Sequence, residues 1–203
     1  MALLFNRLHA FEEYPILAQA YFANGAHTLS LRHVNIIRDL TLFYQWLNDP
    51  HLITNSRLHE KTGRLITYYR HSLESESRQS FLVENVFTSV CQFDISLINL
   101  HELYLRMPTS AGDCILSYVL SDKPDGMVLF KNALRLQLDY FFSFPEPQRI
   151  WVSIPTKQAA FHELFLHTGF SLKSEYTSRQ QRHLLFYLKK AKYTALLMNK
   201  RQT

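Results

Sequence analysis

Residues 114–154 read CILSYVLSDKPDGMVLFKNALRLQLDYFFSFPEPQRIWVSI, which predicts two strands with one helix between them. Residues 114–121 and 149–154 are rich in β-forming residues, whereas apolar residues over 128–142 recur at helical spacing. Parallel neighbouring strands need a crossover connection, and a helix of this length supplies one. We therefore expect the two strands to be adjacent and parallel.

The chain before this run begins with a strand and two helices. Residues 27–33 alternate apolar and polar side chains, and apolar residues from Ile36 onward recur at three- and four-residue spacing. Asn48-Asp49-Pro50 ends that first helix, because proline cannot continue it. The remaining patterns predict a second helix over 56–73 and a four-strand meander over 80–84, 88–95, 102–107 and 114–121.

The chain after the run adds a helix over 158–168, capped by Gly169, and a last strand over 183–188. We interpret residues 1–26 as an N-terminal arm with one short helix, 27–190 as one domain, and 191–203 as a basic tail. Strands that first pair locally and then alternate with helices predict an α/β domain. Its mixed central sheet is flanked by helices on both faces.

Composition narrows the class of protein. The 203 residues are 47% hydrophobic, which is ample for one packed core. No segment offers the roughly 18 apolar residues of a membrane helix, so we expect a cytoplasmic protein without a membrane partner. Cys91 and Cys114 sit in apolar runs, which favours reduced core thiols over a disulfide or a zinc site, and no metal is expected. The net charge of +5 is compatible with nucleic acid, acidic membranes or a phosphorylated cofactor.

Three stretches resemble the GCN5-related N-acetyltransferases, and within them the N-acyltransferases of siderophore biosynthesis that act on hydroxylated lysine-type amines. A strand and helix close with Gln45-Trp46-Leu47-Asn48-Asp49-Pro50, similar to the Trp-x-Asn-Asp-Pro of those enzymes. Gly112-Asp113 precedes the next strand, as in the family. The stretch 149–170 resembles the family's last strand and helix, which end in Gly-Phe, here Gly169-Phe170.

The resemblance implies an N-acyltransferase that binds acetyl-coenzyme A or another acyl-coenzyme A between the splayed strands 114–121 and 149–154. The pyrophosphate would rest on the N-terminus of the helix that starts near Met127, where free N–H groups and the helix dipole favour an anion. The acyl acceptor would be a small-molecule amine or hydroxylamine. The cofactor-binding residues implied in this way are Val119, Leu120, Gly126, Met127, Val128, Leu129 and Gln158.

The family's signature residues are altered in this chain. Val128 and Phe130 occupy glycine positions of the phosphate loop, and Asp125 stands where the family has a basic residue. Asp125 has two interpretations, a helix N-cap or a charge that opposes phosphate. The family's catalytic His aligns near Ser117, which is therefore our candidate catalytic residue.

Other catalytic positions of the family are also replaced. Pro155 stands where the siderophore enzymes have an Asp, and Phe165 where other members have a general-acid Tyr. His162-Glu163 is a minor candidate on the last helix.

Two alternatives stay open. A chain that has lost the glycines and the proton carriers could retain the fold as a catalytically degenerate binding or scaffold protein. An altered loop could also accept the phosphopantetheine arm of an acyl carrier protein. Aromatic and Lys residues interleave over 186–193, as in single-strand binding surfaces, but no established nucleic-acid motif accompanies them. We therefore expect no nucleic-acid partner.

Overall fold

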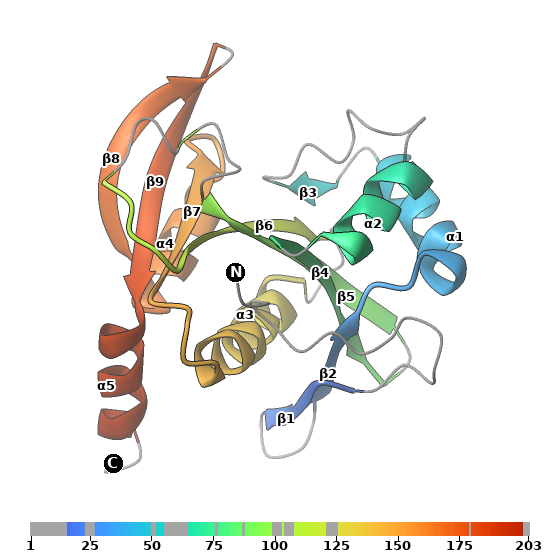
Figure 1. Ribbon diagram of the computed structural model, residues 1–203, viewed down its shortest axis with the longest axis horizontal. Coiled ribbons are helices and arrows are strands. Elements are labelled where there is room, and N and C mark those ends of the chain that lie inside the picture. Colours follow the sequence, from blue (N-terminus) through green and yellow to red (C-terminus); the bar gives the residue numbers. More distant parts are fainter. Residues whose placement is uncertain are drawn as a thin grey trace. The chain divides into compact units, whose positions relative to one another are not determined.

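The computed structural model describes residues 16–22, 27–49, 52–54, 65–75, 77–86, 88–98, 103, 108–120, 126–178 and 180–200. Within these ranges the chain forms nine strands and five helices (Figure 1). The strands are β1 (Ala18–Phe22), β2 (His27–His33), β3 (Ile53–Thr54), β4 (Arg78–Asn85), β5 (Thr88–Leu97), β6 (Asp113–Leu120), β7 (Arg149–Pro155), β8 (Ser171–Ser178) and β9 (Gln181–Lys189). The helices are α1 (Ile36–Leu47), α2 (Leu65–Glu74), α3 (Gly126–Ser143), α4 (Ala159–His167) and α5 (Lys190–Lys200).

The strands hydrogen-bond in the order β1-β2-β4-β5-β6-β7-β9-β8, and β3 pairs with β6. The sheet is mixed, because β6 and β7 run parallel whereas β2 is antiparallel to β4 and β9 is antiparallel to β7. Two compact units divide the chain, one comprising Met1–Ile95 with Ser117–Phe141 and the other Ser96–Leu116 with Phe142–Thr203. The boundary falls inside β6.

The parallel pair predicted from the sequence is confirmed. Its ladder has four pairs, from Asp113 beside Arg149 to Leu116 beside Val152, and α3 is the crossover between the two strands. Strand β6 continues for four more residues after Leu116, to Leu120. Seven of its eight residues are buried, as expected for a central strand covered by helices.

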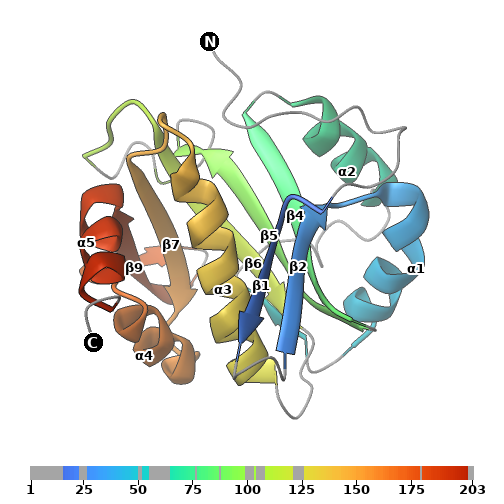
Figure 2. The same cartoon turned by 90° about the horizontal axis from the view of Figure 1, so that it is seen from below.

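Helices cover both faces of the strands in the first unit. Figures 1 and 2 show α1 and α2 on one face and α3 on the other. The α3 face is marked by Phe130, whose ring contacts those of Phe93 on β5 and Tyr118 on β6. The core on the α1 and α2 face consists of Val34, Phe43, Trp46, Leu65, Tyr69, Leu82 and Val119.

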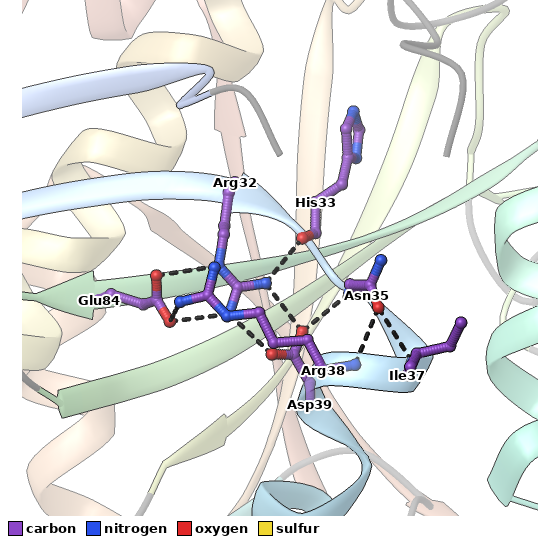
Figure 3. A network of polar contacts seen from close by, with 7 residues as sticks. All are labelled: Arg32, His33, Asn35, Ile37, Arg38, Asp39 and Glu84. Carbon is purple, nitrogen blue, oxygen red and sulfur yellow. Dashed lines mark hydrogen bonds and ion pairs between the residues drawn. The ribbon is translucent and has the colours of Figure 1, made fainter. Parts of the chain in front are cut away.

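A buried ion network fastens α1 to the strands beneath it (Figure 3). The guanidinium of Arg32 on β2 donates to both carboxylate oxygens of Asp39 on α1 and to both of Glu84 on β4. Its remaining N–H donates to the carbonyl of His33. All five donors of the guanidinium are therefore used. Asn35 caps the same helix, since its side chain accepts from the N–H groups of Ile37 and Arg38.

The Gly112-Asp113 motif has a structural role in the second unit. Asp113 is 1% exposed and accepts from the guanidinium of Arg149 and the indole N–H of Trp151. Gly112 has φ +83°, and a Cβ there would lie 2.5 Å from the carbonyl oxygen of Glu146. Only glycine fits this close backbone approach without strain.

Helix ends lie where the sequence predicts them. The side-chain amide of Asn48 donates to the carbonyl of Tyr44 at the end of α1, while Pro50 lies outside the described residues. Helix α4 ends in Gly169, which has φ +103°, followed by an N–H of Phe170 that returns to the carbonyl of Phe165.

Several segments differ from the prediction. Part of the expected N-terminal arm forms β1, an edge strand of the sheet. The rest of the arm, residues 1–15 and 23–26, lies outside the described residues, so the short helix expected there stays a prediction. Strand β8 was not predicted, because most of its side chains are exposed and it has no apolar alternation; pairing with β9 makes it a strand. The expected basic tail begins as helix α5. Of the expected strand 102–107 the structure describes Leu103, which is buried in a helical turn.

Candidate functional site

The start of α3 carries most of the predicted cofactor-binding residues. Gly126 is its first helical residue and is followed by Met127, Val128 and Leu129, the positions whose N–H groups have no acceptor within the helix. Such donors, together with the positive end of the helix dipole, form an anion site. Residues 121–125 lie outside the described part, so the role of Asp125 remains a prediction.

The bulky residues at the glycine positions point in different directions. Phe130 is completely buried against Phe93 and Tyr118, whereas the side chain of Val128 is 60% exposed. Two helical residues that are two positions apart differ by about 200° around the axis, so the two side chains cannot close the helix start from the same side. The structure therefore keeps the ring of Phe130 away from the free N–H groups.

The three predicted site residues on β6 differ in their exposure to solvent. Ser117 is partly exposed, but Val119 and Leu120 are 0% and 1% exposed. Strand β3 pairs with these last two residues, and the hydroxyl of Thr54 donates to the carbonyl of Tyr118 at 2.7 Å. The side chains of Val119 and Leu120 belong to the core, and their part in cofactor binding stays a prediction.

Gln158 lies in the other compact unit, just before α4. Its N–H donates to the carbonyl of Pro155, and its side chain makes no capping bond to the helix. The imidazole Nε2 of His162 lies 3.0 Å from the same carbonyl, which holds that ring against the end of β7. Phe165 is fully buried against Phe170 and offers no proton.

A second polar cluster lies on β7, β8 and β9. The hydroxyl of Ser153 is 2.5 Å from the hydroxyl of Tyr176 and 3.2 Å from Nδ1 of His183. The rings of Tyr176 and His183 stack with centroids 5.4 Å apart. Ser153 follows Val152, the last residue of β7 in the ladder with β6, and it is partly exposed. A hydroxyl between a phenol and an imidazole can relay a proton, because imidazole changes its charge near neutral pH.

Sequence reasoning missed this cluster for a specific reason. Its members are up to 30 residues apart, and Tyr176 is on β8, which has no apolar alternation to reveal it. The signal that was available lies in β7, where Ser153 interrupts the apolar run that begins at Ile150.

The described residues contain no group of three or more His, Cys, Asp or Glu that could hold a metal ion. Both cysteines are buried and unpaired. Burial and, to a smaller extent, the nearby charge of Asp113 raise the pKa of Cys114 to about 12, so its thiol stays protonated and unreactive at neutral pH. No described helix is long and apolar enough to cross a membrane.

This architecture has counterparts among solved structures. No family model and no curated protein match the chain. A protein from Bacillus halodurans superposes with a TM-score of 0.73 at 14% identity, over 88% of this chain and 92% of that one. Mutant forms of the spermidine/spermine N-acetyltransferase SpeG from Vibrio cholerae give 0.65 at 16% identity, over 82% and 96%. The aminoglycoside acetyltransferase AAC(6')-Ib, solved with coenzyme A, gives 0.66 at 15% identity, over 82% and 98%. At these identities the likeness establishes architecture, and the chain has the fold of the GCN5-related N-acetyltransferases.

Proposed function

We propose that this protein is an N-acyltransferase that moves an acetyl or other acyl group from acyl-coenzyme A to a small amine or hydroxylamine. The observation that carries the proposal is the start of α3, where four consecutive N–H groups are free of helical partners and Phe130 is withdrawn into the core. Solved structures with this fold include acetyltransferases for spermidine and for aminoglycosides, the latter with coenzyme A bound.

The pyrophosphate of the cofactor would accept hydrogen bonds from the N–H groups of Gly126, Met127, Val128 and Leu129. Val128 would line this position from the solvent side, where its side chain is exposed. The donors belong to the backbone, so the loss of the family's glycines removes space and flexibility but not the anion site itself.

In the transfer step the acceptor nitrogen attacks the thioester carbonyl carbon, a C–N bond forms and the C–S bond breaks. Coenzyme A leaves as its thiolate, and the proton that the nitrogen loses ends on that sulfur. A hydroxylamine nitrogen is already neutral near pH 7 and needs little help from a base, which makes the siderophore-type acceptor our preferred substrate. The proton of a more basic amine needs a carrier. We assign that role to His183 acting through Ser153. Ser117 on β6 stays a separate candidate that rests on the resemblance alone.

One observation favours a second function. Strand β3 is already paired with the backbone of Val119 and Leu120, and a cofactor that lay along this part of β6 would have to replace it. A protein that retains the fold for binding, without transfer, would be expected to keep this strand in place. An arm carried by an acyl carrier protein is a further possible donor for the enzyme.

Calorimetry with acetyl-coenzyme A tests the proposal on the wild-type protein and on Asp125→Asn. We expect measurable binding that tightens about two- to fivefold in Asp125→Asn, because a like charge beside a phosphate is unfavourable and Asn keeps the capping ability. Asp139→Asn is the matched control, since Asp139 is exposed on α3, about 20 Å along the axis from Gly126. If no form released or absorbed heat at millimolar ligand, the transferase proposal would be overturned, and the proposal of a binding protein would remain.

A further inference from the structure

The hydrogen bonds of Ser153 have a fixed direction once its proton is assigned. Its hydroxyl lies 3.2 Å from Nδ1 of His183 and 2.5 Å from the hydroxyl of Tyr176. A serine hydroxyl has one proton to donate. When that proton is donated to His183, the hydroxyl of Tyr176 is the donor in the second bond. Ser153 is then held by one neighbour and bonded to a base by the other.

Strand register places this cluster on one face of β7, β8 and β9. Ser153 pairs with Leu185, and Tyr176 pairs with His183, two residues before Leu185. Side chains alternate along a strand, so Phe186 points to the other face. There its ring meets that of a histidine on α4. Helix α4 therefore lies against the face opposite to the cluster.

Solvent reaches the cluster. Ser153, Tyr176 and His183 are each partly exposed, whereas Trp151 and Leu185 beside them are 1% and 2% exposed. The two buried side chains belong to an apolar cluster of the second unit, against which Tyr176 packs. The serine and the imidazole thus lie at the rim of an apolar cluster, where a small molecule can approach them from the solvent.

A hydroxyl bonded to an imidazole is the arrangement that turns serine into a nucleophile. Serine is a weak nucleophile by itself, and a neighbouring base activates it by taking its proton. The imidazole of His183 is held in place by stacking on Tyr176, with ring centroids 5.4 Å apart. The hydroxyl of Tyr176 is a donor next to Oγ, where negative charge develops on a carbonyl oxygen under attack.

We infer that Ser153 is a nucleophile that takes an acyl group from a thioester or an activated ester and holds it as an acyl-serine. The inference goes beyond the proposed function, in which the same hydroxyl only passes a proton to His183. Oγ attacks the carbonyl carbon, a C–O bond forms, and the bond to the leaving sulfur or oxygen breaks. His183 takes the serine proton and gives it to the leaving group.

The acyl-serine is resolved in a second step. Water or an amine attacks its carbonyl carbon, a new C–O or C–N bond forms, and the bond to Oγ of Ser153 breaks. The proton of the attacking group passes through His183 to Oγ. With water the protein is a hydrolase of activated acyl compounds, and with an amine it transfers the acyl group in two steps.

Reaction with 4-nitrophenyl acetate tests the nucleophile, because this ester lacks the nucleotide part of coenzyme A and needs no pyrophosphate site. After an acid quench, mass spectrometry of the wild-type protein should show one added acetyl group, and peptide mapping should place it on Ser153. Ser153→Ala should lose this adduct and release 4-nitrophenol no faster than buffer does. The control Ser174→Ala, at an exposed serine of β8, should behave as the wild type does.

Two further variants separate the chemistry from folding. Ser153→Cys keeps a nucleophile and should retain the adduct as a thioester. His183→Gln should slow the release of 4-nitrophenol at least about 100-fold, the lower end of what a general base contributes. Thermal unfolding verifies that each form is folded. If deacylation is too fast for the adduct to accumulate, the steady release of 4-nitrophenol must still disappear in Ser153→Ala.

Three results would overturn the inference: 4-nitrophenol release that Ser153→Ala retains, a wild-type protein that neither acquires the adduct nor accelerates release, or a full rate in His183→Gln. The test is independent of the proposed function. Acetyl-coenzyme A binding without a reaction that depends on Ser153 would keep the transferase and reject the acyl-serine alone. Acylation of Ser153 by 4-nitrophenyl acetate without acetyl-coenzyme A binding would reject the transferase and keep the acyl-serine.

Discussion

Val128 and Phe130 show that the position of a bulky residue on a helix decides whether it obstructs the helix start. The resemblance predicts glycine at both positions, and on that basis both side chains would obstruct the phosphate loop. The helix separates them, because Phe130 enters the core and Val128 faces solvent. Side-chain direction on a helix follows from its 100° per residue, so the identity of a residue matters less than the face it occupies.

Gln137 is a buried polar residue in the core of the first unit. It is 0% exposed on α3, and neither its amide nitrogen nor its amide oxygen has a hydrogen-bond partner among the described residues. Gln137→Leu should raise the free energy of unfolding by about 1–3 kcal/mol, the cost of an unsatisfied buried polar group. Urea denaturation measures this. Gln45→Leu, at an exposed position of α1, should change it by less than about 0.5 kcal/mol. A destabilised Gln137→Leu would show that buried water satisfies the amide in solution.

At the scale of elements, the short strand β3 is the feature that distinguishes the transferase proposal from the binding-protein proposal. It contributes two residues to the sheet, yet those two cover the backbone of β6 beyond its ladder with β7. The hydroxyl of Thr54 adds a bond to the carbonyl of Tyr118. An element this short is held by few contacts, so its displacement by a ligand costs little free energy.

The end of α4 depends on Gly169 for two separable reasons. Its φ of +103° is strained for any residue with a Cβ, and an added Cβ would lie 2.5 Å from a terminal methyl of Leu196 on α5. Gly169→Ala should lower the free energy of unfolding by about 1–3 kcal/mol in denaturant titrations. In a Leu196→Ala background the steric part disappears and only the backbone part should remain. If the cost vanished altogether in that background, the backbone conformation would not be strained.

At the scale of the whole molecule, the network around Arg32 makes stability depend on pH. Burial alone would raise the pKa of Glu84, but hydrogen bonds and the charge of Arg32 outweigh it and hold that pKa below the ordinary value of 4.5. An acid with a lowered folded pKa stabilises the native state above its unfolded pKa, and this stabilisation is lost as pH falls through the folded pKa.

Glu84→Gln should therefore flatten the fall in stability below about pH 4.5, in addition to a loss of about 1–3 kcal/mol at pH 7 from the broken pair. Urea titrations between pH 3 and pH 7 measure both effects. The exposed acid Glu163 on α4 provides the control, because Glu163→Gln should follow the wild-type pH curve. Parallel curves for Glu84→Gln and the wild type would mean that another group governs acid unfolding.

The sequence by itself determined the elements whose patterns are local. The strand 27–33, the start of α1 at Ile36, the crossover α3 between β6 and β7, and the Gly169 end of α4 all follow from alternation, helical spacing and helix-ending residues. Each of these signals is read over a few neighbouring residues. The parallel pairing also followed, because a helix of that length between two strands permits little else.

Tertiary structure decided what local patterns cannot encode. Strand β8 exists through its pairing with β9, and Phe130 became a core residue through its contacts with Phe93 and Tyr118. Contacts between remote side chains belong to the same class: Ser153 meets Tyr176 and His183 across three strands, and Asp94 on β5 meets Tyr68 on α2. These groups are remote in sequence, and the free energy of such a cluster depends on burial and distance, which exist only once the chain has folded.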